Sequence, residues 1–162
     1  MAERVVAAAS PLPVIVVSSA PEVVAWAATR DLECIDDPGS LDAAAAAGRD
    51  VLASRGYARV VVAHGDLPFA HTLEHVAADG TRRVAVVVPC HRENGTPVLS
   101  VPVDAPFAFA YGDGSFARHC ANAHAAGLEV RVVRDPALAF DVDEPDDLRR
   151  VDLDQNASVR SS

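Results

Sequence analysis

The chain alternates short runs of consecutive apolar residues with longer stretches in which alanine and polar residues mix. Valine dominates the apolar runs, and continuous runs of this length are typical of strands buried on both faces of a sheet. The sequence therefore predicts strands at residues 13–18, 32–35, 59–63, 84–89, 97–101 and 128–133.

Helical patterns fill most of the intervals between these runs. Pro21 stands at a favoured first-turn position of a helix over 21–30, and Ser40 can cap a helix over 41–54. Further helices are expected at 3–9, 70–78, 115–127 and from 144 onward. Alternating strands and helices predict an α/β fold with a largely parallel sheet covered on both faces. We expect one domain over residues 1–153 and a polar tail over 154–162.

The net charge of the chain limits the kinds of molecule that it is expected to bind. The 162 residues carry a net charge of −9, and because lysine is absent, all 14 positive side chains are arginines. No basic stripe follows a helix, which argues against nucleic-acid binding. An acidic protein that binds anions needs local devices, namely a metal ion, a helix N-terminus or a well-placed arginine.

The cysteines and the first residues favour a cytoplasmic protein. Cys34, Cys90 and Cys120 are odd in number and lack metal-ligand spacing, as expected for reduced thiols in the cytosol. Prolines at positions 11 and 13 interrupt the apolar stretch that follows Arg4, so we interpret that stretch as a core strand and not as a signal peptide. No apolar run is long enough to span a membrane.

Carboxylates follow two of the predicted strands, where open α/β sheets bind their ligands. Asp66 lies in a Gly-Asp-Leu-Pro turn, and Asp141 and Asp143 follow a later strand signal. Alternation along an extended segment points Asp141 and Asp143 in opposite directions, so only one of them can face a metal shared with Asp66. Mg²⁺ suits such a site because it needs few protein ligands. The alternatives are a helix-capping role for Asp66 and solvated turn residues for the other two.

A glycine-rich segment offers a candidate anion site. Gly112 and Gly114 allow close approach of the backbone, Ser115 begins a helix, and Arg118 lies one turn along it. Helix N-termini and arginines favour phosphate or carboxylate. The simpler alternative is a glycine turn with a serine cap.

The segment from His71 to His75 matches the His-x-x-Glu-His pattern of inverted zinc peptidases. The predicted helix is short and no third ligand helix follows. We therefore favour a solvated His/Glu face over a zinc site.

Several motifs occur together in an order and spacing that resemble one enzyme family. They are Pro38-Gly39-Ser40-Leu41-Asp42, Gly65-Asp66-Leu67-Pro68, Gly95-Thr96, Tyr111-Gly112-Asp113-Gly114-Ser115-Phe116-Ala117-Arg118-His119 and Asp141-Val142-Asp143-Glu144-Pro145-Asp146-Asp147-Leu148. The chain resembles the 2-phospho-L-lactate or phosphoenolpyruvate guanylyltransferases of coenzyme F-420 biosynthesis. The last motif is shared with many nucleotidyltransferases, whereas the Gly-x-x-Ser-x-Ala-Arg-His segment is more specific.

The resemblance implies a Rossmann-like, GT-A-like three-layer sandwich and a GMP transfer. The phosphate of a small phospho-acid would attack the α-phosphorus of GTP, and pyrophosphate would leave. Asp66 and Asp143 would be the catalytic residues that hold Mg²⁺. Thr96, Gly112 and Ser115 would bind the phospho-acid, and Arg118 is added to them from the residue pattern. Such a reaction needs positioning and charge neutralisation more than a covalent nucleophile.

The chain departs from that family at its start. Family members begin with a strand and a loop that carries lysine and arginine around the triphosphate, and no segment here matches them. We therefore expect the 162-residue chain alone to transfer GMP poorly, and we expect an exposed strand edge. Two alternatives stay open: a non-catalytic or truncated relative that keeps the phospho-acid pocket, and a nucleotidyltransferase for molybdopterin or a sugar phosphate. The sequence decides neither the phospho-acid nor the oligomeric state, for which a homodimer stays open.

Overall fold

The computed structural model describes residues 1–77 and 83–140, so the predicted carboxylates at 141 and 143 lie outside the described residues. The elements are α1 (Ala2–Ala9), β1 (Ile15–Val17), α2 (Pro21–Ala28), β2 (Glu33–Ile35), α3 (Leu41–Ser54), β3 (Arg59–Ala63), α4 (Glu74–Ala77), β4 (Val84–Val88), β5 (Val98–Pro102), α5 (Ser115–Ala125) and β6 (Glu129–Val132). Every predicted strand is present, which confirms the α/β class.

The strands form two separate sheets. β1 and β2 make a parallel pair, and a four-stranded sheet has the order β3-β5-β4-β6. Within the larger sheet, β5 runs antiparallel to both β3 and β4, whereas β6 runs parallel to β4. The expectation of a largely parallel sheet therefore holds for the shared direction of β3, β4 and β6, whereas β5 alone is antiparallel, so the sheet is mixed. The cause is the link from β4 to β5, which contains no crossover helix and so returns the chain antiparallel.

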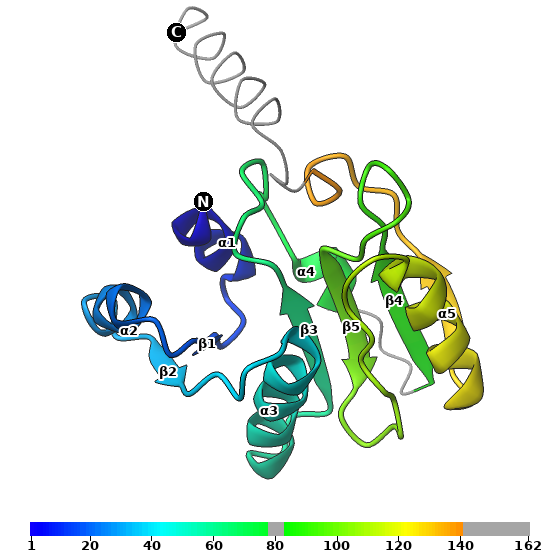
Figure 1. Ribbon diagram of the computed structural model, residues 1–162, viewed down its shortest axis with the longest axis horizontal. Helices are drawn as coiled ribbons and strands as arrows, with labels where there is room; N and C mark the ends of the chain where they lie inside the picture. The colour runs from blue at the N-terminus through cyan, green and yellow to red at the C-terminus, as the bar shows by residue number, and fades with distance from the viewer. Residues whose placement is uncertain (78–82, 141–162) are drawn as a thin grey trace, which may run out of the picture.

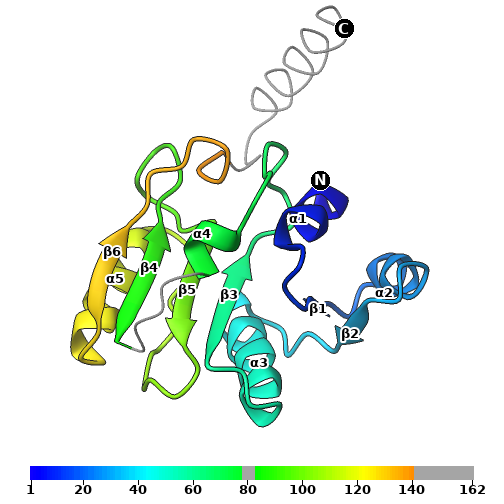
Figure 2. The same ribbon diagram turned by 180° about the vertical axis from the view of Figure 1, so that it is seen from behind.

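Helices cover both faces of the four-stranded sheet. α3 and α5 lie on one face and α4 on the other, with α1 beside it (Figures 1 and 2). The alternation of side chains along β4 divides the core accordingly: Val86 and Val88 pack with α1 and α4, while Ala85 and Val87 pack against α3 and α5. Both central strands are buried along their whole length.

Two helix predictions have different outcomes. Ser40 does cap α3, because its hydroxyl accepts a hydrogen bond from the Ala43 N–H at 3.2 Å. The helix predicted at 70–78 is wrong in extent, since the helical turn begins only at Glu74. The Thr72 hydroxyl accepts the Glu74 N–H at 3.2 Å, which favours a turn before the helix. Among the described residues, no helix combines the length and apolar character needed to cross a membrane.

Candidate active site

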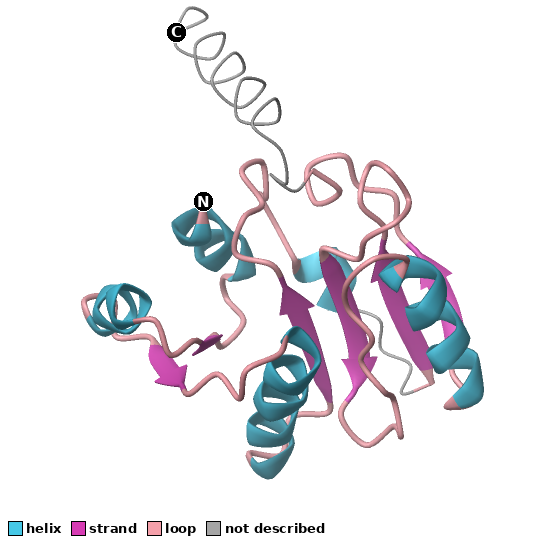
Figure 3. Cartoon of the chain, in the orientation of Figure 1, coloured by secondary structure: helices cyan, strands magenta, loops and turns pink. Residues whose placement is uncertain are grey.

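Several loops meet at one end of the four-stranded sheet. The chain leaves β3 at His64 and β4 at Pro89, and it enters β5 at Val98 beside both of these ends. The N-terminus of α5 and the segment after β6 lie at the same end (Figure 3). The sheet topology therefore places Asp66, Thr96 and Ser115, all three of which the sequence singled out, at the same end of the sheet.

Thr96 and Ser115 form a buried pair of hydroxyls. Their side-chain oxygens are 3.4 Å apart, and the residues are 1% and 2% exposed. Thr96 directly precedes Pro97 and β5, and Ser115 is the first residue of α5. The contact uses one of the two hydroxyl protons, which leaves the second for an acceptor such as a phosphate or carboxylate oxygen.

The glycine loop before α5 is held by Arg118 from within the helix. The Arg118 guanidinium donates to the carbonyls of Ala110 (3.2 Å), Tyr111 (2.8 Å) and Asp113. Gly112 and Gly114 have positive φ angles of 96° and 68°, so the turn requires the conformational freedom of glycine. Arg118, predicted to bind substrate, thus holds the loop that bears the predicted substrate-binding glycines.

Asn94 links this loop to the turn between β4 and β5. Its Oδ1 accepts the Gly114 N–H at 2.9 Å, and its Nδ2 donates to Asp113 Oδ1 at 2.8 Å. The Ser115 N–H donates to the Gly112 carbonyl at 3.0 Å. These bonds already engage two of the amides expected to bind an anion, so the hydroxyls of the Thr96–Ser115 pair are the better candidates for that role.

His119 and Tyr111 form the buried base of the same loop. His119 is fully buried, and its Nε2 accepts the Ala110 N–H at 3.0 Å. Burial lowers the pKa of His119 to about 4, with Arg118 and His64 acting in the same direction and Asp42 opposing them. The Tyr111 ring packs edge-on against His119, with 4.7 Å between ring centroids. Burial, aided by the charge of Asp42, raises the pKa of Tyr111, so its hydroxyl stays protonated.

Some buried polar atoms around this loop have no hydrogen-bond partner among the described residues. They are His64 Nε2, Asp66 Oδ1, Tyr111 Oη and His119 Nδ1. The rings of His64 and Tyr111 are 5.4 Å apart, and both residues, like Asp66, line a cavity of about 960 Å³. Buried polar atoms without partners are costly, and they are common where a ligand supplies the missing bond.

Asp66 is the described residue that best suits a cation. A carboxylate oxygen buried without a donor is an acceptor with free capacity, which matches the oxygen preference of Mg²⁺. The described residues contain no cluster of three or more His, Cys, Asp or Glu side chains that could hold a metal. Asp143, the predicted second ligand, lies outside the described residues.

The zinc-peptidase alternative finds no support in the described residues. His71 precedes α4, so His71 and His75 do not share a helix face. Instead His75 Nε2 lies 3.2 Å from Asp135 Oδ2. Cys34, Cys90 and Cys120 are free thiols, in agreement with the sequence prediction.

Comparison with known proteins decides the family. A family model described as "Guanylyl transferase CofC like" matches residues 1–159. The chain belongs to this family. It is 35% identical over 141 residues to the phosphoenolpyruvate guanylyltransferase of Sphaerobacter thermophilus, covering 85% of this chain and 68% of the relative. It is 32% identical over 153 residues to the enzyme of the same name from Rubrobacter xylanophilus, covering 91% and 74%.

A third relative of this chain is named for a different phospho-acid. It is the 3-phospho-D-glycerate guanylyltransferase of Phenylobacterium zucineum, 35% identical over 113 residues, which are 68% of this chain and 52% of the relative. The predicted resemblance is thereby confirmed at the level of the family. Relatives named for different phospho-acids are similar to this chain to about the same degree, so sequence identity alone does not identify the phospho-acid.

Several residues of this candidate site carry little local signal in the sequence. Asn94 and His119 have their roles through contacts across 9 to 20 positions of the chain. Asp42 lies 69 positions from Tyr111 in the sequence, yet its Oδ1 accepts a hydrogen bond from the Tyr111 N–H at 2.6 Å. His119 ends the Gly-x-x-Ser-x-Ala-Arg-His segment, and that position was the one signal available for it.

Proposed function

We propose that the chain transfers GMP from GTP to a small phospho-acid, with release of pyrophosphate, in coenzyme F-420 biosynthesis. Membership of the CofC-like family and relatives named as phosphoenolpyruvate or 3-phospho-D-glycerate guanylyltransferases support this proposal. The buried Thr96–Ser115 pair, at the same end of the four-stranded sheet as Asp66 with its unpartnered Oδ1, is the observation in this chain that carries it. The mixed α/β fold would then be a variant of the Rossmann-like, GT-A-like sandwich, with residues 1–153 as one domain.

The chemistry requires little of the protein beyond positioning. A phosphate monoester is already anionic near neutral pH, so its oxygen attacks the α-phosphorus of GTP without a general base. A bond forms between an oxygen of the phospho-acid's phosphate and the α-phosphorus of GTP. The bond from this phosphorus to the α–β bridging oxygen breaks, and pyrophosphate leaves with the electron pair. The protein must hold two highly charged molecules in line and exclude water.

Different residues of the site would bind the phospho-acid, fix the glycine loop and hold the metal ion. The Thr96–Ser115 hydroxyl pair binds an oxygen of the phospho-acid, with Gly112 lending close backbone approach. Arg118 and Asn94 fix the conformation of the glycine loop through hydrogen bonds to its backbone, and neutral His119 accepts the N–H of Ala110 just before the loop. Asp66, with Asp143, would hold Mg²⁺, which supplies charge neutralisation at the phosphates.

The test separates binding of the phospho-acid from transfer. Phosphoenolpyruvate, 2-phospho-L-lactate and 3-phosphoglycerate are each titrated into the chain while the amide resonances of Gly112, Gly114 and Ser115 are followed by NMR. GMP adducts formed from GTP and Mg²⁺ are then detected by mass spectrometry. We expect selective shifts with one acid and a matching adduct, formed slowly because this chain alone is expected to transfer GMP poorly.

Matched variants complete the design. Ser115→Ala should weaken the shifts, whereas Ser54→Ala, at the exposed end of α3, should not. Asp66→Asn should abolish the adduct, whereas Asp104→Asn in an exposed turn should keep it. Unmoved amides at millimolar acid together with no adduct would contradict the proposal. Shifts without an adduct would favour a protein that binds the phospho-acid but does not transfer GMP.

A further inference from the structure

An extended segment between β5 and α5, residues 107–111, belongs to neither sheet. Its sequence alternates aromatic residues with alanine, a period of two that is typical of a strand. Phe107 and Phe109 are buried whereas Ala108 is exposed, so the alternation is kept in the structure. The segment runs across β5 between α3 and α5 (Figure 1), and we call it the strap.

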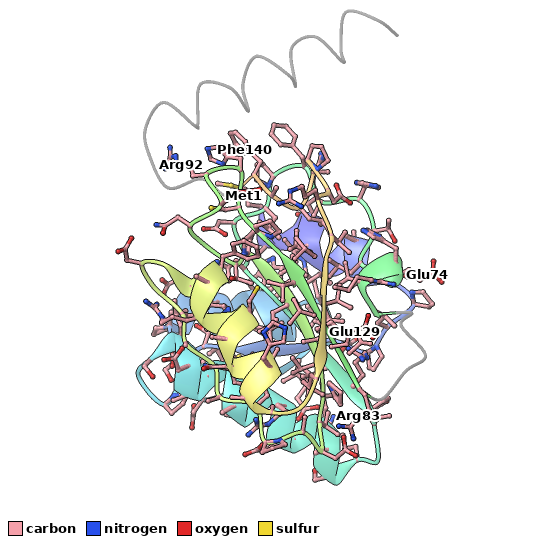
Figure 4. All side chains as sticks on the ribbon, turned by 90° about the vertical axis from the view of Figure 1, so that its right-hand side faces the viewer. Met1, Glu74, Arg83, Arg92, Glu129 and Phe140 are labelled. Atoms are coloured by element: carbon pink, nitrogen blue, oxygen red, sulfur yellow. The ribbon has the colours of Figure 1, made fainter. Side chains whose placement is uncertain are left out.

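Side chains of two helices bond to the backbone of the strap in place of a neighbouring strand. These helices, α3 and α5, lie on one side of the four-stranded sheet, and α4 with Glu74 lies on the other (Figure 4). The bonds are Arg49 Nη1 to the Phe107 carbonyl (3.0 Å), Asn122 Nδ2 to the Ala108 carbonyl (2.8 Å), the Ala110 N–H to His119 Nε2 (3.0 Å), Arg118 Nε to the Ala110 carbonyl (3.2 Å) and the Tyr111 N–H to Asp42 Oδ1 (2.6 Å). Backbone groups that a sheet would pair are thus satisfied by side chains.

The spacing of Asp42 and Arg49 on α3 matches the length of the strap. The two residues are seven positions apart, which is about two helical turns, so they share a face and lie about 10 Å apart along the axis. Four steps of extended chain, from Phe107 to Tyr111, span about 13 Å. Arg49 therefore reaches one end of the strap and Asp42 reaches the other.

Burial holds the Phe107 end of the strap. The Phe107 ring packs against Phe109 and His119, with 5.4 Å and 5.9 Å between ring centroids. Both phenylalanines belong to the core cluster on the α3 and α5 side of the sheet. Burial of an aromatic side chain stabilises a fold more than one hydrogen bond does, so this end depends little on Arg49.

The Tyr111 end of the strap depends more on hydrogen bonds, because the chain turns here into the glycine loop. Arg118 bonds to carbonyls at this end, but it belongs to α5 and holds the loop only to that helix. Asp42 ties the same end to α3, a different element. Asn94 bonds to Gly114 at the far end of the loop. Asp42 and Asn94 therefore fasten the two ends of the glycine loop to the rest of the fold.

From this arrangement we propose that Asp42 is a positioning residue for the phospho-acid site, an inference that rests on the proposed function. Its carboxylate holds the Tyr111 backbone and so sets where Gly112 lies relative to the Thr96–Ser115 hydroxyl pair. A bond from a backbone N–H to a carboxylate is charge-assisted, which suits a contact that must hold a loop in water. Without this acceptor the start of the loop is free to move away from α3, and binding groups held loosely lose affinity.

A different role for Asp42 follows from its place in the first turn of α3. A carboxylate there stabilises the helix through the helix dipole, whatever it does for the loop. The two roles have different requirements. The helix needs the negative charge, whereas the Tyr111 N–H needs an oxygen that accepts a hydrogen bond. Asparagine supplies the oxygen without the charge, and alanine supplies neither.

The test compares Asp42→Asn and Asp42→Ala in the full chain. Glu22→Ala is the matched control, because Glu22 is the acidic residue in the first turn of α2 and takes no part in the bonds of the strap. Phosphoenolpyruvate, 2-phospho-L-lactate and 3-phosphoglycerate are titrated into each protein while the amide resonances of Tyr111, Gly112 and Gly114 are followed by NMR. Circular dichroism establishes that each variant is folded under the conditions of the titration.

Asp42→Ala should weaken the affinity for the phospho-acid by about tenfold, the equivalent of one lost hydrogen bond. Asp42→Asn should bind nearly as tightly as the original chain, because its side-chain oxygen still accepts the Tyr111 N–H. Glu22→Ala should bind as the original chain does. In the absence of ligand, the Tyr111 and Gly112 amide resonances should move in Asp42→Ala and stay close to their original positions in Asp42→Asn.

Unchanged affinity in Asp42→Ala would overturn the proposal. Equal losses in Asp42→Asn and Asp42→Ala would also overturn it, because the charge alone would then matter. Failure of the original chain to bind any of the three acids would contradict the proposed function. The ligand-free spectra still judge Asp42 in that case, and resonances that move in neither variant, or equally in both, would show that Asp42 does not hold the loop.

Discussion

The Ser115 hydroxyl at the start of α5 lies 3.4 Å from the Thr96 hydroxyl at the start of β5, and both residues are almost fully buried. A hydrogen bond from such a pair to a charged ligand oxygen is worth about 1.5–3 kcal/mol. We expect Ser115→Ala to weaken phospho-acid affinity by about tenfold or more. Isothermal titration measures this, and Thr96→Val combined with Ser115→Ala should cost less than the sum of the two, because the hydroxyls act together. Strict additivity would contradict a shared site.

Arg118 should be necessary for the shape of the glycine loop. Arg118→Lys keeps the charge but loses the planar fork that reaches three carbonyls, so we expect a loss of about 1–3 kcal/mol in the free energy of unfolding. Urea denaturation gives this value. Arg55→Lys is the matched control, because Arg55 makes one exposed ion pair with Glu33 and its replacement should change stability much less. Equal effects of the two variants would show that Arg118 does not hold the loop.

Buried His119 should make stability depend on pH. Its pKa is lowered by burial from 6.5 to about 4 in the folded chain. Between these values only the unfolded chain takes up the proton, so the contribution is complete above pH 6.5 and is lost as the pH falls toward 4. The predicted loss is of order 3 kcal/mol. His119→Gln keeps an acceptor for the Ala110 N–H, and its unfolding free energy should fall less over this range. Parallel pH profiles for the two proteins would refute this.

Asp66 should couple stability to divalent cations. Its Oδ1 is buried without a partner among the described residues, so a cation that binds there favours the folded state. Millimolar Mg²⁺ should raise the thermal midpoint of the chain and leave that of Asp66→Asn unchanged. Asp104→Asn, in an exposed turn, serves as the control and should respond like the original chain. Differential scanning fluorimetry measures the thermal midpoint with and without Mg²⁺. An equal response of all three proteins would exclude Asp66 as a ligand.

Sequence patterns predicted local structure better than the way the pieces assemble. The valine runs identified the strands, and Ser40 identified the start of α3, because both signals depend on neighbouring residues. The antiparallel direction of β5 escaped prediction, since hydrophobic runs carry no information on strand direction. The helix around His75 was overestimated because Thr72 begins a competing turn.

In the candidate site too, local motifs were predictable from the sequence whereas contacts between distant segments were not. Asp66, Thr96, Gly112 and Ser115 were chosen from motifs, and the sheet topology brings them to one end of the molecule. What those motifs do not show is the supporting set, in which Asp42 bonds to Tyr111 and Asn94 bonds to Gly114. These contacts depend on how distant segments pack, which no local pattern encodes. Asp143 stays a prediction.

The small side chains of α3 allow this helix to lie close to β1. A Cβ added at Gly48 would lie 3.6 Å from the Val17 Cγ2 of β1, and the neighbouring positions 43–47 are all alanine. The helix can thus lie close to β1 while it also packs on β3. A bulky side chain at position 48 would press on β1 and leave β3, and the loops that follow it, in place. The β1–β2 pair could in this way shift relative to the larger sheet through changes in one helix, far from any atom that touches a substrate.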